Sequence, residues 1–220
     1  MDQDTAPVPS ERVRLRRGAA RGDHDRATIR DILDDALIAH VGVSTDDGPL
    51  VLPMAFGRTD DLLYLHGASA NGLLRAAVDV ELCATVTEVD GLVMARTPFH
   101  NSMNYRSVVI RGRGRRVDEP EEHLEALRLI TDHVVATWDD GRPPNASDLR
   151  RTLVLALPLD EASAKVRAGD PVDEPEDLDG PHWAGTVDLG RRWGAPRRAA
   201  DLLPGISAPL GVVERFGAEV

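Results

Sequence analysis

The sequence predicts a mainly β fold with a few helices, arranged as an antiparallel barrel of six or seven strands. Short apolar runs follow one another in hairpin order, separated by turn sequences such as DDGP at residues 46–49 and RTDD at residues 58–61. Helical segments do not alternate regularly with these runs, which argues against a doubly wound parallel sheet. A small antiparallel barrel is therefore the expected architecture.

The composition excludes several classes of function. The 220 residues include 37 Asp and Glu against 26 Lys and Arg, and the formal net charge of -11 repels a nucleic-acid backbone. A single cysteine, Cys83, allows no intramolecular disulfide. No stretch approaches the about 20 apolar residues of a membrane-spanning helix. We therefore expect a cytoplasmic protein that binds neither nucleic acid nor membranes.

The chain divides into three parts by composition. Residues 1–23 are polar with prolines and an arginine cluster, and we expect an extended N-terminal arm. Residues 24–168 carry the periodic apolar pattern and form the barrel domain. Residues 169–220 are first acidic and then rich in Arg, Pro and Gly, and we expect a C-terminal extension.

The apolar spacing locates the elements of the barrel domain. Helices are predicted over residues 26–37, with Asp25 as a possible cap, over a short segment at 71–80, and over 119–138. In the last helix, Leu124, Leu127, Ile130 and Val134 are expected to face the core. The dipeptide at residues 90–91 predicts a tight turn. Strands are expected at residues 38–45, 50–57, 62–67, 81–89, 92–96, 104–117 and 153–157.

Several familiar catalytic patterns find no support. The GRGR at residues 112–115 lies within a strand pattern and opens no helix, so it is not a phosphate loop. The seven histidines are dispersed without the spacing of a helical zinc motif, which predicts no metal site. Cys83 lies in the middle of a predicted strand, where a buried, inert thiol is usual, and no serine occupies a Gly-x-Ser-x-Gly elbow.

Polar residues at predicted strand ends remain as candidates for a binding site. Strand ends at the rim of a barrel hold side chains rigidly where a ligand can contact several strands. These residues form a cationic, hydrogen-bonding set in an acidic protein, which indicates a small anionic ligand. They are His66, Ser69, Asn71, Arg75, Tyr105, Arg106, Ser107, Lys165 and Arg167.

Four segments in this order resemble a known family. They are PMAFG at 53–57, LLYLHGASANGLLR at 62–75, NYRSVVIRGRGR at 104–115 and EASAKVRAGDPVDEPED at 161–177. Together they resemble the pyridoxamine 5'-phosphate oxidase-like flavoproteins, nearest the nitroimidazole-resistance proteins and their flavin-nucleotide-binding relatives. The resemblance implies a split β-barrel of the FMN-binding type and a homodimer with flavin sites at its interface. It further implies an oxidoreductase that uses FMN to reduce or oxidise a small organic molecule.

The resemblance also assigns roles to residues. It implies that residues 51–55 run along the isoalloxazine ring and that the turn after the next strand receives the flavin phosphate. His66 is implied to lie beside the flavin and to act in the chemistry as a proton donor or polar gate. A strand motif at residues 105–107 and the C-terminal Trp183 complete the pattern. The implied flavin-binding residues are Val51, Leu52, Pro53, Met54, Ala55, His66, Gly67, Ser69, Asn71, Gly72, Arg75, Tyr105, Arg106, Ser107 and Trp183.

One position departs from the pattern. Six residues after the histidine, relatives usually carry an arginine or lysine that pairs with the FMN phosphate, and this chain has Gly72. Ser69, Asn71, Arg75 and backbone N–H groups are then expected to hold the phosphate, with weaker binding. Two alternatives stay open: a deazaflavin-dependent reductase, and a non-catalytic protein that binds or senses a flavin.

Overall fold

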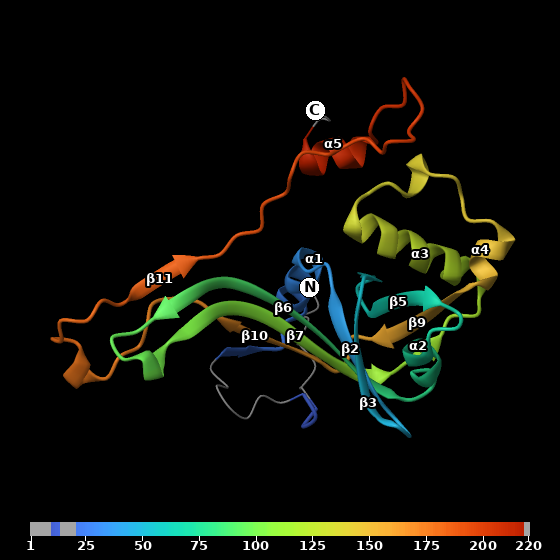
Figure 1. The fold of residues 1–220 in the computed structure, drawn as a ribbon. Helices are drawn as coiled ribbons and strands as arrows, with labels where there is room; N and C mark the ends of the chain where they lie inside the picture. Colours follow the sequence, from blue (N-terminus) through green and yellow to red (C-terminus); the bar gives the residue numbers. More distant parts are fainter. Residues whose placement is uncertain (1–9, 14–20, 218–220) are drawn as a thin grey trace, which may run out of the picture. The chain divides into compact units, whose positions relative to one another are not determined.

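The computed structural model describes residues 10–13 and 21–217, and most of the predicted N-terminal arm lies outside them (Figure 1). In the described chain, the strands form antiparallel sheets of seven and four strands and the helices are few. This confirms the predicted fold class, a mainly β, antiparallel split barrel. No helix within the described ranges is both long and apolar enough to span a bilayer.

The described residues divide into two compact units. Unit 1 contains the residues up to 36, residues 84–110 and residues 161–191. Unit 2 contains residues 37–83, residues 111–160 and the residues from 192 onward. The predicted barrel domain, residues 24–168, contributes to both units, and so does the predicted C-terminal extension.

Unit 1 is built on a sheet with the hydrogen-bonded order β1-β10-β7-β6, to which β11 is added on β6. One helix, α1, begins after Asp25, whose side chain accepts a hydrogen bond from the Thr28 N–H. Its buried residues Ile29, Ile32 and Leu33 confirm the predicted amphipathic pattern. The elements are β1 (Gly22–Asp23), α1 (Arg26–Asp35), most of β6 (Glu81–Met94), η2 (Pro98–His100), most of β7 (Ser102–Arg113), β10 (Ala162–Arg167), η4 (Pro175–Asp177) and β11 (Gly185–Asp188).

The tight turn predicted at residues 90–91 is wrong, because β6 continues through both residues. Gly91 instead pairs with Asp188 of β11. A Cβ atom on residue 91 would lie 2.9 Å from the carbonyl oxygen of Val187, so the glycine allows β11 to approach β6 closely. The sequence reasoning also missed β11 itself, which lies in the predicted extension.

Unit 2 contains the β2–β3 hairpin and the four-stranded sheet, whose order is β4-β5-β9-β8. The single strand predicted over residues 50–57 is divided at Ala55 into β3 and β4. The elements are β2 (Ala39–Thr45), β3 (Gly48–Met54), β4 (Phe56–Arg58), β5 (Leu62–Ala68), α2 (Gly72–Ala76), β8 (Arg115–Arg116), α3 (Pro120–Val134), η3 (Trp138–Asp140), α4 (Ala146–Arg150), β9 (Thr152–Pro158) and α5 (Leu210–Phe216).

Helix α3 covers one face of the four-stranded sheet (Figure 1). Its buried residues are Ala126 and Ile130, which pack with Tyr64 of β5 in one apolar cluster. The predicted core face is wrong for Leu124 and Val134, which are 41% and 40% exposed. The helix therefore faces the sheet with Ile130 and the small Ala126, a residue that the pattern of large apolar side chains did not indicate.

Candidate functional site

His66 lies near the end of β5, on the face of the sheet that α3 covers. Side chains alternate along a strand, so His66 shares this face with Tyr64, which packs against α3. Across the sheet, His66 is paired with Val154 of β9. Its Nδ1 is enclosed and has no hydrogen-bond partner among the described residues. Burial lowers the pKa of His66, so the imidazole is neutral at neutral pH.

The turn after β5 is held by hydrogen bonds within the turn, to α2 and to Arg151 at the end of α4. The Ser69 N–H donates to the Arg151 carbonyl oxygen at 2.7 Å, and the Asn71 N–H donates to the Ala68 carbonyl oxygen at 2.8 Å. The Asn71 side chain caps α2 by accepting from the Leu74 N–H at 3.1 Å. The backbone N–H groups of Ser69 and Asn71 are therefore engaged with carbonyl oxygens of the protein, and the phosphate contacts of the two residues stay a prediction.

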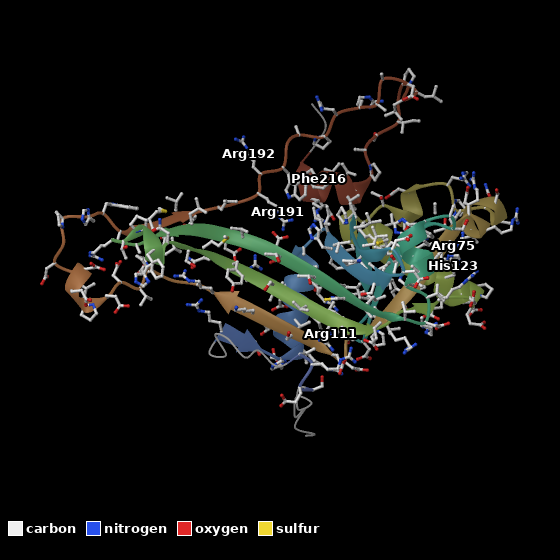
Figure 2. The ribbon with its side chains drawn as sticks, turned by 60° about the horizontal axis from the view of Figure 1, so that its bottom comes forward. Arg75, Arg111, His123, Arg191, Arg192 and Phe216 are labelled. Carbon is white, nitrogen blue, oxygen red and sulfur yellow. The ribbon has the colours of Figure 1, made fainter. Side chains whose placement is uncertain are left out.

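Two glycines in this turn differ in their surroundings. A Cβ atom on Gly67 would lie 2.8 Å from Leu74 Cδ1, so the glycine lets α2 pack against the end of β5. Around Gly72, the first residue of α2, no atom lies within 4 Å of the position a Cβ would take. A larger side chain therefore fits at position 72. The nearest cation along the helix is Arg75, which is exposed (Figure 2).

The strand predicted to run along the flavin ring is β3 with Ala55. Its side chains alternate: Val51 is 58% exposed and Met54 is buried. On β2, Gly42 pairs with Val51, and both line a groove of about 300 Å³ that also includes Cys83 and Arg111. Cys83 is half-buried here rather than buried. An exposed apolar strand face beside a groove is suited to a flat aromatic ligand.

The predicted site residues of unit 1 are engaged with other residues of that unit or are exposed. Arg106 donates from Nε and Nη2 to both carboxylate oxygens of Asp90, at 3.0 and 2.9 Å, and from Nη1 to Asp35. These hydrogen bonds, with Asp90 contributing most, raise the pKa of Arg106. The guanidinium is therefore occupied by two carboxylates within unit 1, and its role as a flavin contact stays a prediction.

The neighbours of Arg106 are placed as follows. Ser107 donates weakly to the Lys165 carbonyl oxygen at 3.4 Å, and Tyr105 pairs with Arg167 across β7 and β10. Arg167 is only 8% exposed and donates to Asn104 Oδ1, so it is not a rim cation. Trp183 is 67% exposed.

The sequence reasoning missed a cavity of about 410 Å³ in unit 2, lined by residues of α3, α4 and β9. His123 of α3 lines it, and its enclosed Nε2 has no hydrogen-bond partner in the described chain. Burial, and secondarily the charge of Arg116, lower the pKa of His123. The sequence held one signal for this residue, a histidine at the start of a strongly predicted helix, but spacing alone gave it no partner.

Comparison with known proteins identifies the family. The model of the pyridoxamine 5'-phosphate oxidase family matches residues 25–166. The chain belongs to this family. The resemblance seen in the ordered sequence segments is thereby confirmed. No curated protein matches the chain significantly.

Solved structures with similar folds extend this result. The flavocytochrome Anf3 from Azotobacter vinelandii is 34% identical, with a TM-score of 0.90, over 94% of this chain and 97% of that chain. The FAD and heme binding protein from Mycobacterium smegmatis is 32% identical, with a TM-score of 0.84, over 90% and 98%. A candidate 5-nitroimidazole antibiotic resistance protein from Bacteroides thetaiotaomicron is 28% identical, with a TM-score of 0.56, over 66% and 86%. The first two matches extend well beyond the family segment, into the C-terminal region.

Proposed function

We propose that this member of the pyridoxamine 5'-phosphate oxidase family is a redox protein that binds a flavin, FAD, together with haem. One observation carries the proposal. Two solved structures that match at least 90% of both chains, at 34% and 32% identity, are a flavocytochrome and an FAD- and haem-binding protein. At this identity and coverage, the residues that build a binding site are comparable along nearly the whole chain.

Unit 2 supports flavin binding by the shape of its β2–β3 surface. The exposed Val51 and the groove beside it offer an apolar floor for a ring, as the sequence predicted for this strand. Arg111 also lines this groove and supplies a cation beside the floor. FAD carries an adenylate half that needs contacts beyond those of FMN. FMN and a deazaflavin remain the competing cofactors.

The histidines of unit 2 fit the chemistry of haem. Haem iron is commonly held by the imidazole of a histidine, which must be neutral to coordinate. Burial lowers the pKa values of His66 and His123, which keeps both imidazoles neutral and therefore chemically able to coordinate iron. No cluster of three or more metal-ligating side chains exists among the described residues, but a porphyrin supplies four ligands of its own and needs no such cluster.

The bound groups would supply hydride and single-electron transfer, and the protein would supply position and electrostatics. Because the pKa of His66 is lowered, its imidazole is neutral and can donate one hydrogen bond and accept another. This suits the role of a proton donor or polar gate beside a flavin. A small organic molecule is the proposed reaction partner.

We also propose a homodimer in which the second copy covers the β3 surface. The exposed side chains of this strand are apolar: Pro49, Val51 and Pro53. Apolar strand faces of this kind mark interfaces or ligand sites. Light scattering on the purified protein is expected to give twice the mass of 23.9 kDa.

Cofactor titration tests the proposal. The protein is freed of bound flavin and titrated in separate samples with FAD, FMN and a deazaflavin, using quenching of flavin fluorescence. A fourth sample is titrated with hemin and followed at the Soret band. We expect FAD to bind more tightly than the other two flavins, and hemin to bind as well. A protein that takes up none of the flavins would contradict the flavin assignment, and flavin that binds but is never reduced would favour the non-catalytic alternative.

A further inference from the structure

A second cavity of unit 2 lies in its C-terminal segment and measures about 570 Å³. Its lining comes from the loop before α5, from α5 itself and from Asp140 of η3. It shares no lining residue with the β2–β3 groove or with the cavity at His123. The volume falls within the roughly 300–1,000 Å³ of small-molecule sites.

Helix α5, which forms one wall of this cavity, is held against the C-terminal end of α3 (Figure 1). Arg215 of α5 donates from Nη1 to the His133 carbonyl oxygen at 3.2 Å. Gly211 lies so close to the Ala136 carbonyl oxygen that a Cβ atom at this position would collide with it. The wall is therefore fixed by contacts with the helical layer of unit 2.

The loop before α5 forms the other wall, and Arg198 gives this loop its shape. The Arg198 guanidinium donates to the Ile206 carbonyl oxygen at 2.8 Å and more weakly to the Leu203 carbonyl oxygen at 3.4 Å. Between these two carbonyl groups, Gly205 has a φ of +82°, a conformation that glycine adopts without strain. Both walls of the cavity are thus built by specific contacts.

Most of the side chains that line the cavity are apolar, and some of them are exposed to water. Leu210 and Ile206 both line it and are 68% and 45% exposed. Leu202 and Val212 add further apolar surface. Apolar side chains that gather in a concave site are typical of places where a ligand covers them. The cavity therefore suits a ligand with an apolar body.

The charged residues of the lining favour an acidic ligand. They are two arginines, Arg197 and Arg198, against one aspartate, Asp140. Arg197 is exposed, and it makes no ion pair or hydrogen bond within the part of the chain that the structure describes. A guanidinium group binds a carboxylate through two parallel N–H donors. Arg197 is therefore available to pair with a carboxylate of the ligand.

We propose that this cavity binds a small organic acid that has an apolar body and one carboxylate. Arg197 pairs with the carboxylate, and Ile206 and Leu210 contact the apolar body. The features that carry the proposal are an unpaired guanidinium and exposed apolar side chains in one cavity. Apart from Asp140, the walls lie outside residues 25–166, which the family model matches. The proposal goes beyond the flavin and haem function and does not depend on it.

Calorimetric titration of the full-length protein with octanoate, octanol and octylamine tests the chemistry of the ligand. The three probes share one apolar chain and differ in the charge of the head group. We expect octanoate to bind most tightly, octanol more weakly and octylamine most weakly. Equal affinity for octanoate and octanol would contradict the pairing with Arg197. Tighter binding of octylamine would assign the charged contact to Asp140 and overturn the proposal.

Arg197 and Arg192 form a matched pair of variants. Both are exposed arginines of the C-terminal segment, and Arg192, labelled in Figure 2, does not line the cavity. R197Q is expected to weaken octanoate binding roughly fivefold, because the contact that it removes is exposed to solvent. Octanol binding should stay unchanged in R197Q, and R192Q should match wild type with both probes. An equal loss of octanoate affinity in R192Q would show that net charge, and not this cavity, determines binding.

Leu210 and Leu203 give a second matched pair, which tests the location of the apolar contact. They are 68% and 69% exposed, and only Leu210 lines the cavity. L210Q is expected to weaken the binding of octanoate and of octanol several-fold, whereas L203Q should leave both unchanged. Circular dichroism verifies that the four variants are folded, which their exposed positions favour. Equal effects of L210Q and L203Q would overturn the assignment of the cavity.

Failure of this proposal can be told from failure of the proposed function. A wild-type protein that takes up flavin but does not bind octanoate would overturn this site and leave the flavin assignment intact. A protein that binds octanoate as expected but takes up no flavin would have the opposite meaning. Both titrations use the same preparation of the full chain.

Discussion

The Arg106 region of unit 1 and the histidine region of unit 2 treat their polar groups in opposite ways. In unit 1, the Arg106 guanidinium is shared between Asp90 and Asp35, and the pKa of the arginine is raised. In unit 2, the enclosed nitrogens of His66 and His123 have no partners within the described chain, and both pKa values are lowered by burial. The Arg106 guanidinium thus has hydrogen-bond partners within its own unit, whereas the enclosed nitrogens of the two histidines have none among the described residues.

This difference separates stabilising groups from ligand-binding groups. A cation whose hydrogen bonds are made within its own unit stabilises that unit and has little left to offer a ligand. A neutral imidazole without a partner costs stability until something binds it. Arg106 therefore has a structural role, and the two histidines are the stronger candidates for binding a ligand.

The largest expected effect is at Arg106. R106Q is expected to lower the free energy of unfolding by about 1–3 kcal/mol, because it removes charge-assisted hydrogen bonds to two carboxylates that are partly exposed. Urea unfolding followed by circular dichroism measures this change. R128Q, which breaks an exposed ion pair on α3, is the control and should have a much smaller effect. A large loss of flavin affinity in R106Q at unchanged stability would contradict the structural role of Arg106.

Gly72 is expected to give the next largest effect. G72R places a cation at the position where the family resemblance implies one, and the space around position 72 is open. Flavin affinity is expected to rise about tenfold, which corresponds to ~1.4 kcal/mol for a charge-assisted contact with phosphate. Isothermal titration with FAD measures the change, and G72Q is the neutral control. An equal gain in G72Q would show that charge is not the cause.

A substitution of Tyr64 tests whether the side chains next to His66, on the sheet face that α3 covers, contribute to stability. The Tyr64 hydroxyl donates to Glu122 Oε1 at 3.0 Å, and burial followed by this hydrogen bond raises the pKa of Tyr64 to about 12. Y64F is expected to lower the free energy of unfolding by about 1 kcal/mol. It should also remove the tyrosine ionisation near pH 12 that absorbance detects in wild type. Retention of that ionisation in Y64F would contradict its assignment to Tyr64.

The smallest expected effect is the pH dependence of stability. The folded pKa values of His66 and His123 are lowered, so the unfolded chain binds more protons below the unfolded value of about 6.5. Stability contributed by keeping these rings neutral is therefore present at pH 7.5 and declines as the pH falls through about 6.5. Urea unfolding at pH 7.5 and 5.5 measures the decline. The double variant H66Q/H123Q is expected to show a smaller one, and an unchanged decline would place the titrating groups elsewhere.

The sequence predicted the fold because its signals were local. The Asp25 cap, the apolar run of β9 and the proline at the start of α3 each specify their element without distant contacts. The tight turn predicted at residues 90–91 was wrong because, in the sequence alone, a glycine that permits the close approach of β11 cannot be told from a glycine in a turn.

The candidate site was only partly predictable. His66 was predicted from its place at a strand end and from the resemblance, and the structure adds that its Nδ1 is enclosed and that burial lowers its pKa. Arg106 was predicted as a rim cation, since the sequence could not show Asp35 and Asp90 beside it. The cavity at His123 was missed because its walls come from α3, α4 and β9, which only the folded chain brings together.

The cofactor content of the protein, purified from cells supplied with a haem precursor, tests the central claim most directly. Flavin is released by heat and identified by chromatography, and haem is counted by its pyridine haemochrome spectrum. We predict FAD and haem, each close to one per chain. A protein that carries FMN or a deazaflavin and no haem, or that carries neither group, would contradict the account.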